Sequence, residues 1–175
     1  MITADIVVCA AGPQTSLVGD TIDLHIPVAP GRVEIIATMP LESRFKTYLS
    51  ANGLYGRQTL RGNLVFGGGP HEWIDVNLTQ TPPKPNTPLI RNLSRRLAEL
   101  LPGFQDLRLL RSWSGIVEQT PDKMPIIDKL SQPEGLVIVT VSGNGFGLSP
   151  ATGTAVKELI VDGQCSFDIS PFNFN

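Results

Sequence analysis

The stretch Val139–Asp162, VTVSGNGFGLSPATGTAVKELIVD, places a strand, a glycine turn and a helix in direct succession. The apolar, β-branched run Leu136–Val141 predicts a buried strand. Ser149 stands where an N-cap belongs and Pro150 at the first helical position, so we expect the helix to begin there. Gly163 follows the last apolar residues and predicts the end of the helix.

The turn Ser142–Gly147 favours close approach of the backbone to a ligand. Backbone N–H groups and a helix N-terminus stabilise an anionic or electron-rich ligand group. A tight strand-to-helix connection without any ligand explains the glycine spacing equally well, because a lone glycine cluster is weak evidence. The expected apolar face of the helix consists of Ala151, Ala155, Val156, Leu159 and Ile160.

Two segments together resemble a known signature: SGNGFGLSPATG, Ser142–Gly153, and before it WSGIVEQTPDKMPIID, Trp113–Asp128. They are similar to the C-terminal signature of FAD-dependent amine and amino-acid oxidoreductases, the D-amino-acid oxidase superfamily. This family includes glycine oxidase, sarcosine oxidase and the flavin subunits of heteromeric dehydrogenases. The resemblance implies that the glycine turn passes the flavin ring and that the helix N-terminus points at the pyrimidine C2 carbonyl. The cofactor contacts it implies there are Gly143, Asn144, Gly145, Phe146, Gly147 and Leu148.

The run Ala4–Ala11, ADIVVCAA, is short and apolar, and Gly12-Pro13 ends it. Such a run suits a strand that is buried on both faces of a parallel sheet, although any buried edge strand has the same pattern. The longer segment ADIVVCAAGPQTS resembles the second dinucleotide motif of the same flavoproteins, in which a strand ending in Ala-Gly runs beside the FAD pyrophosphate. The resemblance therefore implies cofactor contacts at Ala11 and Gly12.

The family opens with a strand and a GxGxxG motif that hold the ADP half of FAD. This sequence has no such motif, since Gly67–Gly69 has neither the spacing nor a helix after it. The resemblance thus covers nearly the whole chain but only about the C-terminal half of a family member. We expect either a fragment or a partner polypeptide that carries GxGxxG, and we expect the chain alone to hold FAD poorly.

The segment Tyr48–Gly69 predicts two strands around a turn at Leu60–Asn63. The family has a comparable antiparallel hairpin, on which a tyrosine points at the substrate carboxylate, and that position falls on Tyr55. Arg57 shares a face with Tyr55, because side chains two residues apart in a strand point the same way. We assign Tyr55 and Arg57 as candidate catalytic residues. The alternatives are an ordinary strand tyrosine and a solvated cation.

The remaining elements complete an antiparallel substrate sheet. Leu24–Thr38 predicts two strand pieces around Pro30-Gly31, and Thr87 begins a helix that ends at Pro102-Gly103. We expect the leucines of this helix in the core, and its arginines, Arg91, Arg95 and Arg96, on a solvated face. Leu107–Val117 predicts a strand that ends near Trp113-Ser114-Gly115. In the family this strand returns from the substrate sheet to the FAD domain, which implies cofactor contacts at Trp113, Gly115 and Asp122.

Two positions depart from the family pattern. In glycine-oxidase-like members an arginine clamps the substrate carboxylate, a bidentate task suited to guanidinium, and here that position is Val117. Either another cation such as Arg57 takes the carboxylate, or the substrate differs. In monomeric sarcosine oxidases a cysteine bonds covalently to the flavin, and the aligned residue here is Gly115. We therefore expect non-covalent FAD.

Composition narrows the class of protein. The chain has 175 residues, 41% of them hydrophobic and 17% charged, which is typical of a globular protein. The net charge of -2 does not favour nucleic acid or an acidic membrane, and the longest apolar runs are too short to span a bilayer. The chain has only two cysteines, and its N-terminus is unlike a signal peptide, which predicts a cytoplasmic protein. Neither histidine has further ligands at metal spacing, so we expect no metal site.

These observations predict an α+β fold: a partial FAD-binding Rossmann-like domain from residues 1–24 and 120–175, and an antiparallel-sheet substrate domain from residues 25–119. The implied function is oxidation of the C–N bond of an amino acid or secondary amine by hydride transfer to FAD, as an oxidase or a dehydrogenase. One alternative is a non-catalytic fragment or assembly module, with apolar surface along Ile6–Ala10 exposed to a partner. Another is a nucleotide-binding domain without a redox role.

Overall fold

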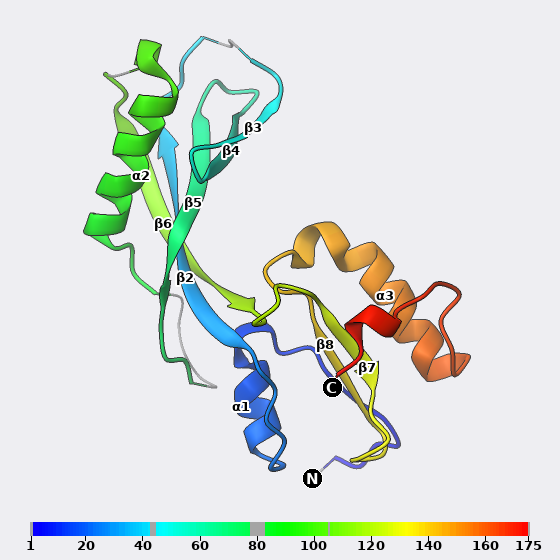
Figure 1. Cartoon of the computed structure of the whole chain (residues 1–175). Helices are drawn as coiled ribbons and strands as arrows, with labels where there is room; N and C mark the ends of the chain where they lie inside the picture. The colour runs from blue at the N-terminus through cyan, green and yellow to red at the C-terminus, as the bar shows by residue number, and fades with distance from the viewer. Residues whose placement is uncertain (1, 43–44, 78–82, 105, 175) are drawn as a thin grey trace. The chain divides into compact units, whose positions relative to one another are not determined.

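The structure is a computed structural model that describes residues 2–42, 45–77, 83–104 and 106–174 (Figure 1). The chain divides into two compact units. The first comprises Met1–Gly31, Asp75–Gln80 and Val117–Asn175, and the second comprises Arg32–Ile74 and Thr81–Ile116. None of the helices in the described ranges has the length and apolar content that crossing a bilayer requires.

The first unit contains a small mixed sheet with the strand order β1-β8-β7. β1 (Val7–Cys9) pairs in parallel with β8 (Leu136–Thr140), and β7 (Ile126–Lys129) pairs with β8 in antiparallel register. All residues of β8 are buried, which confirms the buried strand predicted there. The core around it consists of Cys9, Ile26, Val28, Ile126, Leu130, Leu136 and Ile138.

β1 is shorter and less buried than its sequence predicts. Val7 is 56% exposed and Val8 is 40% exposed, so the expected burial on both faces is wrong for these two residues. The reason is that β1 lies at the edge of its sheet and has β8 as its neighbour on one side. The exposed apolar surface expected along this run is therefore present. Two short helices that the sequence did not predict follow β1: η1 (Gly12–Gln14) and α1 (Thr15–Asp20).

The helix of the glycine signature, α3 (Gly145–Val161), begins earlier than predicted. Its N-cap is Asn144, so the expectation of a start at Ser149 and Pro150 is wrong, and Pro150 lies inside the helix. A proline cannot donate to the carbonyl four residues before it, but the Ser149 hydroxyl donates to that carbonyl, on Phe146, at 3.0 Å. Gly163 has φ +77° and ends the helix as predicted. The short helix η3 (Ser170–Phe172) lies near the C-terminus.

The second unit is built on an antiparallel sheet with the order β3-β4-β5-β2-β6. Its strands are β2 (Ala29–Thr38), β3 (Tyr48–Ala51), β4 (Leu54–Gln58), β5 (Leu64–Trp73) and β6 (Leu109–Gln119). β4 and β5 pair as expected on the two sides of the turn at Leu60–Asn63. However, Asn52 and Gly53, with φ of 51° and 64°, form a second turn that splits the first predicted strand into β3 and β4. Of the two strand pieces predicted in Leu24–Thr38, the first is wrong, since residues 24–28 form no strand. The second lies in β2, which begins at Ala29 and has Pro30 near its start, where a missing N–H is tolerated.

The helix α2 (Thr87–Leu100) covers one face of this sheet (Figure 1). Asn86 caps it, since its Oδ1 accepts a hydrogen bond from the Leu89 N–H. Leu93 and Leu97 are buried with Ile36, Leu54, Leu64 and Phe66, and η2 (Pro102–Phe104) follows, as the predicted helix end requires. Arg96 does not lie on a solvated face as predicted, because its guanidinium donates to the carbonyls of Asn52 and Gly69.

Candidate functional site

In the first unit the two halves of the predicted signature meet at a buried pair, Thr120 and Ser142. The Thr120 N–H donates to Ser142 Oγ at 3.1 Å, and the two hydroxyl oxygens lie 2.9 Å apart. Thr120 is 3% exposed and Ser142 is 3% exposed, so these bonds form away from water. Ser142 has φ 48°, an uncommon value for a residue with a side chain, and the two bonds hold it there. The pair therefore fixes where the glycine turn leaves β8.

The N-terminus of α3 is open. Its first residues, Gly145, Phe146 and Gly147, have N–H groups with no acceptor one turn earlier in the helix, whereas the Leu148 N–H already bonds to the Asn144 carbonyl at 3.1 Å. The Phe146 side chain is fully exposed, and Leu148 is 38% exposed. Free N–H groups, the positive end of the helix dipole and exposed apolar side chains together suit a planar, electron-rich ligand.

A cavity of about 400 Å³ lies beside this helix. Most of its wall is apolar, and Glu118 is the charged residue among those that line it. The Thr140 hydroxyl and the Glu118 carboxylate lie 3.4 Å apart, so the carboxylate is anchored to the end of β8. The lining residues are Val8, Ala10, Gly12, Glu118, Val139, Thr140, Val141, Gly145, Ser149, Thr152, Gly153 and Val156.

Both predicted glycine turns lie close to Glu118. Gly12 has φ +54° and Gly143 has φ +79°, so each adopts a backbone conformation that favours glycine. A Cβ on Gly12 would stand 3.9 Å from the Glu118 carboxylate, and one on Gly143 would stand 3.6 Å from the Glu118 carbonyl. The structure therefore brings the predicted contacts Gly12 and Gly143 near one another. Sequence reasoning missed Glu118, although a carboxylate between an apolar strand and the Thr-Pro-Asp turn was a visible signal.

Two other predicted cofactor contacts have structural roles. Ala11 is half-buried and packs against the core of the first unit. Asp122 shapes the Thr-Pro-Asp turn, since its Oδ1 accepts a hydrogen bond from the Met124 N–H at 2.9 Å. That hydrogen bond lowers the pKa of the exposed Asp122 carboxyl, which stays ionised near neutral pH. Neither residue lines the cavity beside α3.

In the second unit, Tyr55 and Arg57 lie on the sheet face opposite α2. A Cβ added to Gly67 would stand 3.4 Å from the Tyr55 ring, which places the ring over Gly67. Burial raises the pKa of the Tyr55 hydroxyl, with the neighbouring Tyr48 as a smaller cause, so the hydroxyl is neutral at physiological pH. Tyr55 is 37% exposed.

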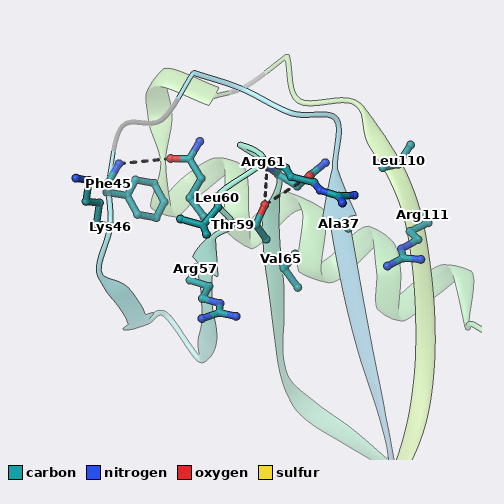
Figure 2. Close-up of a pocket in the computed structure, with 12 residues that line it drawn as sticks. Ala37, Phe45, Lys46, Arg57, Thr59, Leu60, Arg61, Val65, Leu110 and Arg111 are labelled. Carbon is teal, nitrogen blue, oxygen red and sulfur yellow. Dashed lines mark hydrogen bonds between the residues drawn. The ribbon is translucent and has the colours of Figure 1, made fainter.

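The same face carries a second cavity, of about 980 Å³ (Figure 2). Arg57 lines it and Tyr55 does not, so the two candidate catalytic residues share a face but not this cavity.

Trp113 lies on β6 with the Arg111 guanidinium 5.0 Å from its ring centre, an arrangement that favours a cation–π contact. A Cβ on Gly115 would meet no atom within 4 Å, so that segment of β6 has room for a ligand. The residues that line the cavity are Ala37, Phe45, Lys46, Arg57, Gln58, Thr59, Leu60, Arg61, Asn63, Val65, Leu110 and Arg111.

The described part of the chain thus combines an antiparallel sheet with a strand, glycine turn and helix held to a Thr-Pro-Asp turn. These are the parts that the resemblance to FAD-dependent oxidoreductases implied. The chain belongs to the FAD dependent oxidoreductase family, whose family model matches residues 2–159. This confirms the resemblance found in the sequence.

Curated relatives and solved structures agree on this family. The chain is 28% identical to glycine oxidase of Geobacillus kaustophilus over 97% of its own length and 44% of the relative's length. It is 28% identical to the sarcosine oxidase beta subunit, from Rhodobacter capsulatus, over 89% of its own length and 37% of the relative's. The crystal structure of the Geobacillus kaustophilus glycine oxidase superposes with a TM-score of 0.84 at 26% identity, covering 99% of this chain and 46% of that one. The chain therefore spans less than half the length of these relatives, and the predicted α+β fold is confirmed.

Proposed function

We propose that this chain supplies the substrate sheet and the flavin-facing glycine turn of an FAD-dependent oxidoreductase that oxidises the C–N bond of an amino acid or secondary amine. The observation that carries the proposal is the Thr120–Ser142 pair, which fixes the open N-terminus of α3 beside the glycine turn. A buried serine held in the αL conformation is a costly backbone feature of the kind that gathers at ligand sites, so it favours a ligand here over a plain connection.

The residues present fit a flavin bound without a covalent bond. The N–H groups of Gly145, Phe146 and Gly147 would stabilise negative charge at the flavin pyrimidine edge, where the dipole of α3 adds to their effect. Glu118 is placed to accept hydrogen bonds from hydroxyl groups, whereas its charge disfavours a phosphate at the same spot. Bound FAD would supply the redox chemistry by accepting a hydride.

On the substrate side, Tyr55 and Arg57 remain our candidates for binding the substrate carboxylate. A neutral tyrosine hydroxyl donates a hydrogen bond without adding charge, and a guanidinium matches a carboxylate in two places. Val117 occupies the position at which glycine-oxidase-like relatives are expected to carry their arginine, so we assign that task to Arg57. The division of the chain into an FAD-domain piece, 1–24 with 120–175, and a substrate piece, 25–119, is part of this proposal.

We also propose that a second polypeptide segment carrying GxGxxG completes the flavin site. The exposed edge of β1, with Val7 and Val8 uncovered, supports an additional parallel strand there. Two relatives, from sarcosine oxidase and opine oxidase, are named as subunits of larger enzymes. The same exposed edge also favours the second candidate, an assembly module that binds its partner without catalysis.

The test is an absorption spectrum of the chain purified from its native source, combined with intact masses of everything that co-purifies. We expect flavin bands at about 370 and about 450 nm, the usual absorption of this cofactor. The masses should reveal a second polypeptide. Acid precipitation should release the flavin, because no covalent bond holds it. A colourless preparation with a partner would favour the assembly module, and a colourless chain without a partner would contradict both candidates.

A further inference from the structure

We infer that the basic cavity on the open face of the second unit binds an anionic group, a carboxylate or a phosphate, which the substrate carries in addition to its reacting amino-acid centre. The inference rests on the proposed function and narrows the substrate class to amino acids or amines with a second acidic group. The basic cavity is the space of about 980 Å³ lined by Lys46, Arg57, Arg61 and Arg111 among other residues.

The charges in the basic cavity are unbalanced. Lys46, Arg57, Arg61 and Arg111 contribute positive charge, and no acidic side chain is among the described residues that line the cavity. The ion pairs found within the described ranges use other cations: Arg32, Arg95 and Lys157. Like charges repel one another, so a cluster of unpaired cations around a hollow favours binding of an anion. The chain as a whole is acidic, with a net charge of -2, so this field is local.

Hydrogen bonds connect the segments around Arg61 in the wall of the basic cavity. Gln58 is 8% exposed, and its Nε2 donates to the carbonyls of Glu42 at 2.9 Å and Gly62 at 3.0 Å. These bonds tie the chain before Phe45 to the turn that carries Arg61. Asn63 closes the same turn, since its carbonyl accepts from the Thr59 N–H at 2.8 Å. A held turn presents its cation at lower entropic cost than a loose loop would.

The cations reach the cavity from different segments: Arg57 lies on β4, Arg111 on β6 and Arg61 in the turn between β4 and β5. Figure 2 shows Arg57 and Arg111 on either side of Val65, while the Arg61 side chain extends toward Ala37. Arg111 is also in contact with the Trp113 ring, which limits the directions its guanidinium can take. A single guanidinium can bind two oxygens of one carboxylate or phosphate, so each of these arginines offers a site for an acidic group. The volume of the cavity suits a small molecule, because ligand pockets typically measure about 300–1,000 Å³.

Of the two residues that we assign to the reacting centre, Arg57 lines the basic cavity and Tyr55 lies outside it. Within the second unit, the cavity adjoins the turn between Gln58 and Leu64, whereas Tyr55 lies farther along β4, toward the Asn52-Gly53 turn. A substrate held at Tyr55 and Arg57 by one carboxylate would therefore reach Arg61 and Arg111 with a second acidic group. Arg57 would serve both ends of such a ligand.

Calorimetric titration of the full chain at low salt tests this inference with three probes: glutarate, butyrate and inorganic pyrophosphate. Glutarate and butyrate differ mainly in the second carboxylate, so we expect glutarate to bind about tenfold more tightly or better. Its affinity should fall as salt is added, because salt screens exposed charges. Tighter binding of pyrophosphate than of glutarate would identify the second acidic group as a phosphate, and the reverse order would identify it as a carboxylate.

Variants locate the site. Arg61→Gln and Arg111→Gln should each weaken glutarate binding about tenfold, since each removes charge-assisted hydrogen bonds. Arg91→Gln is the matched control: it removes the same charge from an exposed position on α2 and should leave the affinity unchanged. Equal binding of glutarate and butyrate, or wild-type affinity in both cavity variants, would overturn the inference.

The proposed function and this inference can fail separately, because the titration needs no flavin. A chain that selects glutarate but never associates with flavin would keep the anion site and contradict the flavoenzyme proposal. A flavin-containing complex that does not distinguish glutarate from butyrate would keep the flavoenzyme and contradict the second acidic group.

Discussion

Glu34 is a carboxylate buried in the second unit, with its side chain 1% exposed. Its Oε1 accepts a hydrogen bond from the Asn86 N–H at 2.9 Å, but its Oε2 has no partner in the structure. Desolvation by burial is the largest cause that raises the pKa of this carboxyl, and the Asn86 hydrogen bond and the Arg32 charge offset it only in part. A buried oxygen without a partner destabilises the fold when the group is ionised.

The first prediction is that Glu34→Gln raises the melting temperature by a few degrees at pH 7. Because the pKa of Glu34 is raised in the folded state, its contribution to stability is present at low pH and is lost as the pH rises through the folded pKa. The advantage of the variant should therefore shrink toward pH 4, where Glu34 is protonated. Thermal unfolding from pH 4 to 8 measures the melting temperature of the variant and its dependence on pH, and the exposed Glu99→Gln is the control. A variant less stable than the wild type at pH 7 would contradict the prediction.

The second prediction concerns the Thr120–Ser142 pair. Ser142→Ala leaves the buried Thr120 N–H without its acceptor, so we expect a loss of roughly 1–3 kcal/mol in the free energy of unfolding. Denaturant unfolding measures the loss, and Ser131→Ala, at an exposed position of the same unit, should change it little. If both substitutions have the same small effect, the pair does not hold the glycine turn.

At the scale of single elements, one substitution in α3 should have opposite effects on the stability of the chain and on its binding of flavin. A Cβ on Gly147 would meet no atom within 4 Å, and Gly147 lies in the first turn of the helix. The third prediction is therefore that Gly147→Ala stabilises the chain without flavin by about 0.5 kcal/mol, because alanine favours helix. The same methyl group occupies space beside the open N–H groups, so flavin should bind to the complete complex about tenfold more weakly.

Thr154→Ala, on an exposed part of α3, is the control for Gly147→Ala. It should affect stability slightly and leave flavin affinity unchanged. Unfolding of the chain and flavin titration of the complex provide the two measurements. Unchanged flavin affinity in Gly147→Ala would mean that the first turn of α3 does not face the cofactor.

The fourth prediction concerns the turn between β3 and β4. Gly53 has φ +64°, and a Cβ there would collide with the Arg96 guanidinium, which donates to the Asn52 carbonyl at 3.0 Å through its Nε. Gly53→Ala should therefore cost about 1–2 kcal/mol of stability, through backbone strain and the displaced arginine. Gly103→Ala is the control, since a Cβ on Gly103 meets nothing within 4 Å. Equal stability of the two variants, measured by denaturant unfolding, would contradict this explanation of the turn.

Sequence patterns predicted elements best where one physical cause dominates. α2 and β8 formed as expected, because an amphipathic period and a β-branched run each require burial on a defined side. The start of α3 was wrong because Ser149 and Pro150 resemble a cap, whereas the bond from Ser149 to Phe146 lets the helix continue through the proline. The extra turn at Asn52-Gly53 had a visible signal, the Asn-Gly pair, which the strand pattern around it obscured.

At the scale of the whole molecule, the edge of the first unit's sheet yields the fifth prediction. Val7 is 56% exposed on β1, where we propose that a further strand adds, and it does not line the cavity beside α3. Val7→Lys should reduce aggregation of the isolated chain, because a charge protects an exposed edge, and should also weaken association with a GxGxxG-bearing polypeptide. Size-exclusion chromatography with and without that polypeptide measures both effects. Ile22→Lys, which adds a charge at a residue that is 49% exposed, should leave the association intact.

In the sequence by itself, the resemblance of two signature segments to known flavoproteins determined the family. Apolar periods and turn residues determined the α+β class, because they are local properties of the chain. The tertiary structure decided what those segments form together. Residues that are distant in sequence meet in three places: the Thr120–Ser142 pair, the contact region of Glu118 with two glycine turns, and the basic cavity. Such contacts cannot be predicted from spacing along the chain, because they depend on strand order and side-chain packing in the folded units.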